Sequence, residues 1–541
     1  MNPRMLKNPL IYIVSLAFIL RLVGLSSFPV GLNPDEASQG YSAYSILKTG
    51  NDEWGNRLPT TSIKSFLDYK APLYTYLTVP SVAIFDLNRF SVRLPSALIG
   101  VVSVYLIYFL ANAIYPGSGA VASFLLAISP WAISFSRSAM EANLAPAILF
   151  AAFYFLLKSQ SKPRFFILST FFFSLSLYAY HATKIFVPIF LIIYILKYKN
   201  KYDSKTLFFS LFTLLLLASP IIVAMLSGSA GKRGSELLLT SINAQQLKSI
   251  QDIQFFSEAG GLTRIFYNKI TFYWHLFLEN YLSYFSPVFW LSSGSGNTSY
   301  SNLPNFGLVY FWTLPFIFLG LKEIVQKGKN KFFLLLWLFI GPIPAAITKD
   351  PYHAHRAVVL MGLLEIFSAI GLSKLFKKSK IYLYLFLIVC LLSLSSYIFK
   401  YAFVYPVKHI NGMSNLFNQS IIEVLKFETS YKYVYLPERF ELQSLVALYQ
   451  KTDPILFQSA TKDWQSRLSV RPDILYLDQL PNITLGKFTF KSFNWPDDAN
   501  TDSLYLALAE KLPQKRHTLK IIYTNDQSVF AEIFDFRYEA K

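Results

Sequence analysis

Two adjacent carboxylates, Asp35 and Glu36, follow the first long apolar segment of the chain. They stand where a membrane helix would reach the surface. A carboxylate at such a boundary can take a proton from an acceptor hydroxyl, because partial desolvation raises its pKa toward the working range. The alternative is that Asn33 or Asp35 caps the next helix and an acid in its first turn complements the helix dipole. The two interpretations are compatible, since a cap also fixes the direction of a carboxylate.

Other ionisable residues fall on the same side of the membrane in the topology described below. Such residues are costly at or inside a bilayer and therefore raise a functional question. The outer-face group comprises Asp35, Glu36, Lys70, Arg137, Glu141, His181, Lys184, Asp350, His353, His355 and Arg356. These residues are far apart in the sequence, so their shared side indicates a common site.

Glu141 follows Arg137 by four residues, between two predicted helices. It could be a second catalytic acid, a metal ligand, or the ion partner of Arg137 at helical spacing. Two acids from different loops could hold a divalent cation through oxygen ligands. The sequence leaves these alternatives open.

Residues 352–356, with the sequence Tyr-His-Ala-His-Arg, precede another predicted helix. His353 and His355 resemble half of a metal site, but a third ligand is not evident. Arg356 beside a histidine at the outer start of a helix suits a phosphate better, because the helix N-terminus also attracts anions.

Lys70 is a candidate for a second phosphate contact, and its alternative is a lysine that snorkels at the interface. His181 and Lys184 are weaker candidates, since a polar cap between two helices would explain them. No phosphate-binding P-loop and no dinucleotide fingerprint occurs in the chain. The pattern therefore favours a donor that is already activated and anchored in the membrane, such as a polyprenyl-linked sugar phosphate. Cations would stabilise the leaving phosphate while a carboxylate deprotonates the acceptor.

The elements that must position these residues are membrane helices. Only 15% of the 541 residues are charged, against about 25% in soluble domains. Apolar runs of roughly 20 residues, enough to span a bilayer core, recur as far as about residue 400. They predict eleven spanning helices, at about 9–29, 92–114, 119–136, 143–158, 164–180, 183–197, 206–226, 303–321, 331–348, 356–373 and 381–400.

The basic residues predict the orientation of these helices. The connections that share a face with the N-terminus are rich in lysine, as at 197–205, 322–331 and 374–380, and contain only Asp203 and Glu323 as acids. Short Lys- and Arg-rich loops stay cytoplasmic, so we expect the N-terminus inside and, with an odd helix count, the C-terminal domain outside. A cleaved signal peptide is disfavoured by Arg21 in the first segment.

The net charge of +19 does not indicate nucleic acid. Much of this charge lies in the predicted cytoplasmic loops, where anionic lipid is its natural partner. The one cysteine, Cys390, lies in an apolar segment and excludes both an intrachain disulfide and a cysteine-rich zinc site.

The sequence divides into a transmembrane domain, 1–400, and a soluble α/β domain, 401–541. The outer loops 30–91 and 227–302 are long, and residues 36–48 and 71–85 predict amphipathic helices at the membrane interface, joined by a turn-rich loop at 50–59. In the second domain, 431–436, 474–477 and 518–523 predict strands, the last continuing into a hairpin, and 439–450 predicts a helix.

Several motifs occur in an order that resembles the lipid-carrier-dependent glycosyltransferases of the GT-C superfamily, similar to protein O-mannosyltransferases and the aminoarabinose transferase of lipid A. The motifs are Pro34-Asp35-Glu36 followed by Tyr41, Lys70-Ala71-Pro72-Leu73-Tyr74, Arg93-Leu94-Pro95-Ser96-Ala97-Leu98, Ser136-Arg137 through Glu141, and His355-Arg356. The resemblance covers about residues 10–400.

The resemblance implies a GT-C fold, a polyprenyl-phosphate sugar donor, and inverting transfer to an extracytoplasmic lipid, glycan or protein. It implies Asp35 as the catalytic base with Glu36 beside it, and Lys70 and Arg356 at the donor phosphate, with Arg137 and His355 grouped there. Glu141 takes the second acidic position. Ala71 departs from the family motif, which has proline there.

Two other functions would also suit a membrane protein of this kind. A transporter or polymerase of lipid-linked glycans would place ionisable residues near the middle of the bilayer and show internal symmetry, whereas this sequence shows neither. A non-catalytic scaffold would use the acids only as helix caps.

Overall fold

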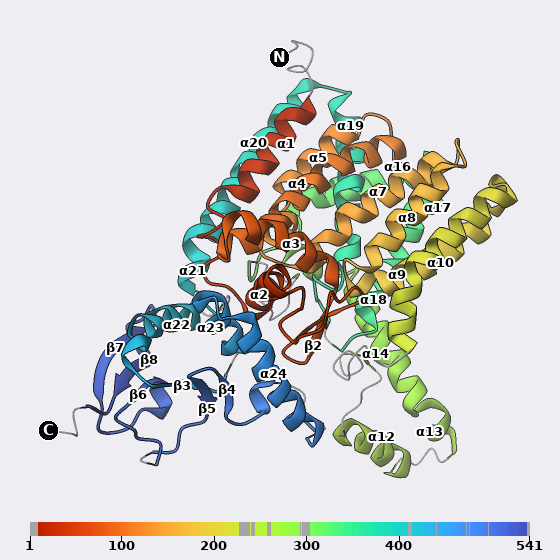
Figure 1. Cartoon of the computed structure of the whole chain (residues 1–541). Coiled ribbons are helices and arrows are strands. Elements are labelled where there is room, and N and C mark those ends of the chain that lie inside the picture. The colour runs from red at the N-terminus through yellow and green to blue at the C-terminus, as the bar shows by residue number, and fades with distance from the viewer. Residues whose placement is uncertain are drawn as a thin grey trace.

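A bundle of helices forms most of the protein, and a smaller α/β unit lies beyond one end of it (Figure 1). The structure is a computed structural model. It describes residues 9–226, 238–239, 244–256, 261–292, 294, 303–349, 351–408, 414–439, 441–471, 473–474, 477–495 and 497–537.

The apolar runs of the sequence form the bundle, because a helix satisfies its own backbone polar groups where water is absent. Each of the eleven predicted segments contains at least one helix. These helices are α1 (Pro9–Leu22), α4 (Arg89–Ile114), α5 (Gly119–Ile128), α6 (Pro130–Ser136), α7 (Leu144–Ser159), α8 (Phe165–Leu177), α9 (His181–Tyr198), α10 (Ser204–Leu226), α16 (Leu314–Lys327), α17 (Lys331–Ile340), α18 (Ile343–Ala346), α19 (Leu363–Phe376) and α20 (Lys380–Phe399).

Within the described residues, six helices are long and apolar enough to cross a membrane, or seven if α5 and α6 form one span. These two meet at an angle of 60°, because Pro130 begins α6 and cannot continue the hydrogen bonding of α5. Shorter apolar helices coincide with three further predicted spans, namely 9–29, 164–180 and 331–348. The number of eleven spans stays a prediction.

Close packing in the bundle uses glycine where two helices cross. A Cβ atom on Gly320 of α16 would collide with the backbone of Phe367 on α19, and one on Gly371 of α19 would collide with the carbonyl of Phe316 on α16. Small residues of this kind allow helix backbones to approach closely in membranes. The pair α16 and α19 therefore forms a tightly packed part of the bundle.

Both predicted helices of the first outer loop are present, as α2 (Pro34–Thr49) and α3 (Pro72–Phe85). The expectation of an amphipathic surface helix is wrong for α2, because every residue from Glu36 to Ala43 is buried. The helix carries many small residues, and neighbouring protein covers this part of it. Between α2 and α3 lies a short hairpin of β1 (Ile63–Ser65) and β2 (Asp68–Lys70).

The second outer loop contains further helices. The described parts form α12 (Ala244–Phe256), α13 (Gly261–Phe266), α14 (Lys269–Ser283) and α15 (Pro287–Leu291). The Gly- and Ser-rich stretch at 227–235 lies outside the described residues, as does Asp350.

The α/β unit has a six-stranded sheet in the order β4-β5-β3-β6-β8-β7. The strand β3 is parallel to β5 and β6, and the other pairs are antiparallel. Its elements are α22 (Asn415–Phe427), β3 (Tyr433–Pro437), α23 (Leu442–Gln450), α24 (Pro454–Ser469), β4 (Ile483–Leu485), β5 (Phe488–Lys491), β6 (Ser503–Leu508), β7 (His517–Tyr523) and β8 (Val529–Asp535).

Two of the three predicted strands are confirmed, as β3 and β7, and β7 forms the predicted hairpin with β8. The predicted helix at 439–450 is α23. The prediction of a strand at 474–477 is wrong at Leu477, which begins a short 3-10 turn, Leu477–Gln479; residues 475 and 476 lie outside the described residues. The helix α20 continues through 400–404 into α21 (Tyr405–Lys408), so the proposed domain boundary falls inside helical chain.

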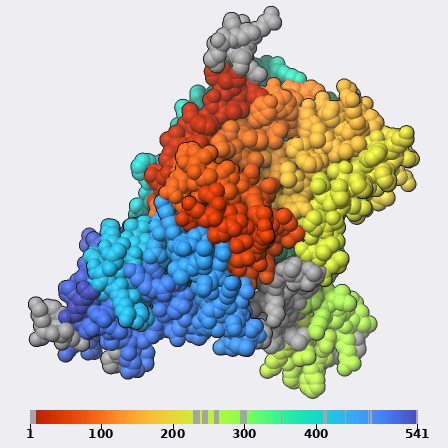
Figure 2. Space-filling model, in the orientation of Figure 1, coloured from red at the N-terminus to blue at the C-terminus, as the bar shows by residue number. Residues whose placement is uncertain are grey.

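The α/β unit packs directly on the first outer loop (Figures 1 and 2). The Tyr41 hydroxyl of α2 donates to the Thr452 carbonyl at 2.9 Å. Gln458 of α24 donates to the hydroxyl oxygens of Ser45 and Thr49, both at 3.0 Å. These contacts explain why α2 is buried: one side faces the bundle and another faces the second domain.

Candidate active site

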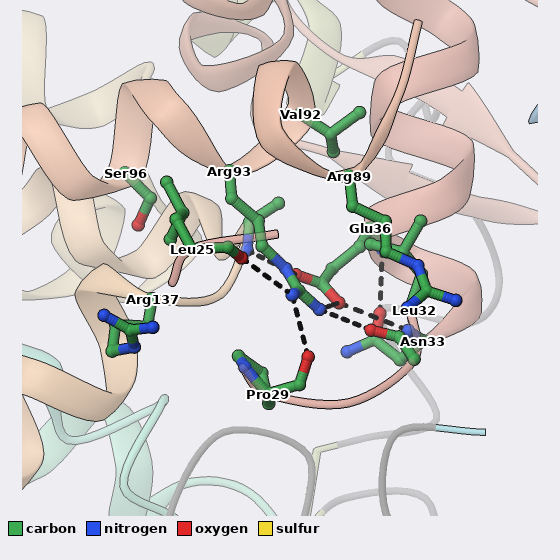
Figure 3. Close-up of polar contacts among 12 residues, drawn as sticks. Leu25, Pro29, Leu32, Asn33, Glu36, Arg89, Val92, Arg93, Ser96 and Arg137 are labelled. Carbon is green, nitrogen blue, oxygen red and sulfur yellow. Dashed lines mark hydrogen bonds and ion pairs between the residues drawn. The ribbon is translucent and has the colours of Figure 1, made fainter. Parts of the chain in front are cut away.

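Glu36 forms the centre of a closed, buried cluster (Figure 3). Its carboxylate accepts from Arg93 of α4 through Nε at 2.9 Å and Nη2 at 3.1 Å, and both side chains are fully buried. The backbone N–H groups of Asn33 (3.3 Å) and Ala139 (2.8 Å) also donate to it. Four hydrogen bonds fill the acceptor positions of this carboxylate, and Glu36 therefore has no free lone pair for a substrate.

Arg93 uses its remaining donors on the chain before α2. It donates to the carbonyls of Leu25 at 3.3 Å, Pro29 at 2.8 Å and Gly31 at 2.5 Å. Asn33 caps α2, since its side chain accepts from the Glu36 N–H at 2.8 Å in a reciprocal capping box. Arg93 and Asn33 together fix where α2 begins and how its first turn is rotated.

Asp35 lies in the same turn but faces outward. Residues 31–46 are buried or half-buried apart from Asp35, whose side chain is 54% exposed. Its Oδ1 lies 3.0 Å from Nζ of Lys70, a side chain that is only 6% exposed. Lys70 also donates to the Asp35 backbone carbonyl at 3.0 Å. The pair thus presents one accessible carboxylate against a lysine held inside the protein.

Glu141 lies near Asp35 and Lys70, and the group formed around these three residues is called the open cluster. Lys70 ends β2, and the next N–H, that of Ala71, donates to Oε2 of Glu141 at 2.9 Å. The charges of Lys70, Asp68, Asp35 and Lys184 all act on Glu141. A hairpin strand and the short 3-10 turn Glu141–Asn143 therefore bring Glu141 to Lys70 and Asp35. The ion pair with Arg137 that the spacing suggested is not the contact Glu141 makes.

The segment before α19 adds positive charge and two histidines. Arg356 and Glu141 both lie close enough to Tyr180 for their charges to act on its hydroxyl. The charge of Asp35 acts in the same way on His355. Arg356 donates through Nη1 to Oγ1 of Thr348 at 2.8 Å. The His355 ring stacks on Phe135, with centroids 4.6 Å apart. These interactions place residues from four distant segments in one electrostatic neighbourhood.

Both histidines of this segment are neutral at ordinary pH. Burial lowers the pKa of His355 to about 4, with Asp35 opposing and Arg356 adding to the shift. Burial, with Arg356 and His355 nearby, lowers the pKa of His353 to about 2. Within residues 352–356, positive charge is therefore restricted to Arg356, and His355 would act as a neutral hydrogen-bonding group.

Four other candidates make contacts that support the fold. Arg137 donates to carbonyls in the last turn of α1 and in the segment just after it, and Tyr41 binds the second domain as described above. His181 meets the Tyr69 carbonyl at 2.9 Å through Nε2, and Lys184 lies 3.2 Å from its Nδ1. His181 and Lys184 thus form a short chain of hydrogen bonds from Tyr69. Lys184 lies close enough to Glu141 for their charges to interact.

A second buried acid, Glu53, lies close enough to Lys70 for the charge of Lys70 to act on it. Its Oε1 accepts from the Ser38 hydroxyl of α2 at 3.1 Å, and its side chain is almost fully buried. Burial raises the pKa of Glu53 to about 8, although the positive charge of Lys70 opposes the shift. Asp52 beside it is also buried and binds the N–H groups of Trp54 and Asn56.

A metal site is not evident in the part of the chain that the structure describes, because no three His, Cys, Asp or Glu side chains converge there. His353 and His355 have ring centroids 5.5 Å apart and gain no third ligand of this type. The carboxylate of Asp35 is instead paired with a cation, Lys70.

The sequence pointed to most of the open cluster but gave no role to Arg93 and Glu53. Arg93 carried a detectable signal, because an arginine in the first turns of an apolar helix is expensive without a partner. Glu53 lay in a turn-rich loop, where an acid is normally solvated, and nothing in the sequence indicated its burial.

Comparisons with known proteins agree with this architecture. Residues 69–223 match the family model for dolichyl-phosphate-mannose-protein mannosyltransferase. The chain is similar to the crystal structure of ArnT from Cupriavidus metallidurans in the apo state, with 11% identity, 97% of each chain covered and a TM-score of 0.54. For ArnT bound to undecaprenyl phosphate the TM-score is 0.55, with the same identity and coverage. No curated protein sequence matches the chain.

These matches confirm the fold class predicted from the sequence, a helical membrane protein with a C-terminal α/β unit. They also confirm the resemblance to the GT-C glycosyltransferases.

Proposed function

We propose that the protein is an integral-membrane glycosyltransferase that moves a sugar from a polyprenyl-phosphate donor to an extracytoplasmic lipid, glycan or protein. The observation that carries the proposal is Asp35, an accessible carboxylate in an otherwise buried segment, paired with the buried cation Lys70. A base must reach solvent-borne acceptor and membrane-borne donor together, and a carboxylate at the mouth of the bundle can do so.

In the proposed reaction, Asp35 accepts the proton of an acceptor hydroxyl. The hydroxyl oxygen attacks C1 of the sugar as the bond from C1 to the phosphate oxygen breaks, and the electron pair of that bond leaves with the polyprenyl phosphate. A single displacement of this kind inverts the configuration at C1. General-base catalysis contributes about 100- to 10,000-fold to such a step.

The leaving phosphate needs positive charge in a site shielded from water. Lys70 and Arg356 supply fixed cations around Asp35 and Glu141, and the neutral His355 can donate a hydrogen bond. Glu141 accepts from the N–H that follows Lys70, and we propose that this contact orients Lys70 through the hairpin. In this scheme Glu36 holds α2 in place and takes no part in proton transfer.

An apolar pocket next to the cluster suits a polyprenyl chain. It is lined by aromatic and aliphatic residues of α14–α19, among them Tyr284, Trp290, Ile317, Leu364 and Phe367. The hydroxyl of Tyr284 accepts from the His353 N–H at 3.3 Å, so the pocket adjoins the segment that carries Arg356. A lipid tail in the pocket would place its phosphate near the cations.

The donor class has support beyond the geometry. The matched family model is named for a dolichyl-phosphate-mannose enzyme, and ArnT is known with undecaprenyl phosphate bound. Both are phosphates on long isoprenoid lipids. We propose the same class of carrier here.

The test of the function is the product. Membranes that contain the wild-type protein should yield a sugar-modified glycolipid or glycoprotein by mass spectrometry, and membranes with Asp35→Asn should lack it. Asp86→Asn is the matched control, because Asp86 is also an exposed aspartate paired with a lysine, Lys451. Identical products from wild type and Asp35→Asn would overturn the assignment.

We further propose that the α/β unit and the open cluster face the outside of the cell. Cys390 is buried and gives little background for thiol labelling. Gln527→Cys, in the exposed hairpin turn of the α/β unit, should react with an impermeant reagent in intact cells. Lys329→Cys should react only after the membrane is opened, and the reverse pattern would contradict the orientation.

A further inference from the structure

We propose that Asn418, a residue of the α/β unit, is a positioning residue for Asp35. The inference rests on the proposed function, since it concerns the orientation of the proposed base. It makes the second domain a working part of the active site, in addition to any part it has in binding an acceptor.

Asn418 grips the backbone immediately before α2. The N–H of Leu32 donates to its Oδ1 at 3.1 Å, and its Nδ2 donates to the Leu32 carbonyl at 2.8 Å. Both residues are completely buried. One side-chain amide thus satisfies the donor and the acceptor of a single residue, as a neighbouring β-strand would. A buried backbone group left without a partner is costly, so the loop has a strong preference for this position.

Asn418 is itself held from two directions. Its Nδ2 also donates to the Ser414 carbonyl at 2.7 Å, and the hydroxyl of Tyr449 on α23 donates to its Oδ1. Arg89 of α4 donates to that hydroxyl through Nε at 3.0 Å and Nη2 at 2.9 Å. A chain of hydrogen bonds therefore runs from α4 through Tyr449 and Asn418 to Leu32.

Two arginines of α4 hold the loop before α2, one directly and one through the α/β unit. Arg93 and Arg89 are one turn apart on α4. Arg93 binds the loop directly, at Pro29 and Gly31, whereas Arg89 reaches it through the second domain. Asp35 follows the last residue of this segment, Leu32, by only three residues. Figure 3 shows the contacts of Arg93 with Pro29 and Glu36 in this loop and in the first turn of α2.

Orientation of the base is worth a large factor in rate. A misplacement of about 1 Å can cost about 100-fold, and Asp35 is in the first turn of α2, where the path of the preceding loop sets its direction. Other contacts of the α/β unit, such as that of Gln458, meet the far end of α2. They hold the domains together without touching the loop that leads to Asp35.

The test compares Asn418→Ala with Gln458→Ala in the full-length protein reconstituted in lipid. The readout is the single-turnover rate constant for transfer from a pre-bound polyprenyl-phosphate sugar, because this constant does not depend on the fraction of protein that is folded. Asn418→Ala should lower it about 10- to 100-fold with donor KM within about twofold, while Gln458→Ala should leave it within about twofold of wild type.

Tyr449→Phe provides a milder variant in case Asn418→Ala fails to fold. It removes the hydroxyl between Arg89 and Asn418 but keeps the ring, so a decrease of about 3- to 10-fold is expected. Equal rate constants for wild type and Tyr449→Phe or Asn418→Ala would overturn the inference. Absence of transfer by the wild type would instead overturn the proposed function, so the two failures are distinguishable.

Discussion

The two carboxylates at the start of α2 have opposite environments. Glu36 is fully buried, with Arg93 and two backbone N–H groups filling its oxygens, whereas Asp35 is 54% exposed and faces Lys70. Consecutive residues of a helix point about 100° apart, so one turn can direct one acid toward the surface and the next into the fold. The closed cluster around Glu36 holds the first turn of α2 in place, and Asp35 lies in that same turn.

Charge in this protein has two separate uses. Around Glu36, Arg93 binds carbonyls and a carboxylate that are all internal, and every partner belongs to the chain. Around Asp35, cations and acids from distant segments meet where the Asp35 side chain is exposed. A substitution in the first cluster should change folding, and one in the second should change catalysis.

The largest effect is expected for Arg93→Met. It leaves Glu36 buried without its cation, and breaking a buried pair in this way costs about 3–5 kcal/mol. The yield of folded protein and the midpoint of thermal unfolding in detergent should both fall sharply. The double variant Glu36→Leu/Arg93→Met should recover part of the loss, because it removes both charges. A fully stable Arg93→Met protein would show that the closed cluster does not support the fold.

Arg356→Gln should affect donor use and leave the fold intact. Loss of a charged hydrogen bond to the donor phosphate costs about 2 kcal/mol, equivalent to about 30-fold in kcat/KM for the donor. The midpoint of unfolding should change little. Arg439→Gln, which removes an exposed arginine paired with Glu510 in the α/β unit, is the control. Unchanged donor kinetics in Arg356→Gln would remove Arg356 from the phosphate site.

Glu53→Gln should have the smallest effect at pH 5, and the effect on stability should grow as pH rises. The unfolded chain releases the Glu53 proton near the ordinary pKa of 4.5, but the folded protein keeps it up to about 8. The unfolded state therefore binds fewer protons between these values, and wild-type stability falls as pH rises, by at most about 1.4 kcal/mol for each pH unit. Glutamine does not titrate and lacks this decrease.

The measurement for Glu53 is the unfolding midpoint of both proteins from pH 5 to pH 8. The difference between variant and wild type should move in favour of Glu53→Gln as pH rises. A difference that stays constant across this range would contradict a buried, neutral Glu53.

Much of the bundle could be predicted because membrane helices follow directly from long apolar runs. The same reasoning failed for α2, since its small and polar residues suggested an amphipathic surface helix. Its burial depends on Tyr41, Ser45 and Thr49 meeting a domain more than 350 residues away in the sequence. Local periodicity contains no information about that partner.

The sequence indicated which residues could gather at the candidate site, but not which contacts each of them makes. The predicted topology put Asp35, Lys70, Glu141 and Arg356 on the same side of the membrane. That Glu36 pairs with Arg93, and Arg137 with the end of α1, depends on side-chain directions that the sequence does not specify. The neutral state of His355 likewise follows from burial, which only the folded structure reveals.

The most direct test of the account compares Asp35→Asn with Glu36→Gln in one single-turnover transfer assay, with unfolding midpoints measured on the same samples. Asp35→Asn should lower the rate constant about 100- to 10,000-fold with little change in the midpoint. Glu36→Gln should lower the midpoint clearly, while the protein that remains folded keeps a rate constant within about tenfold of wild type. Full activity in Asp35→Asn, or a stable but inactive Glu36→Gln, would contradict the assignment of catalysis to the exposed acid.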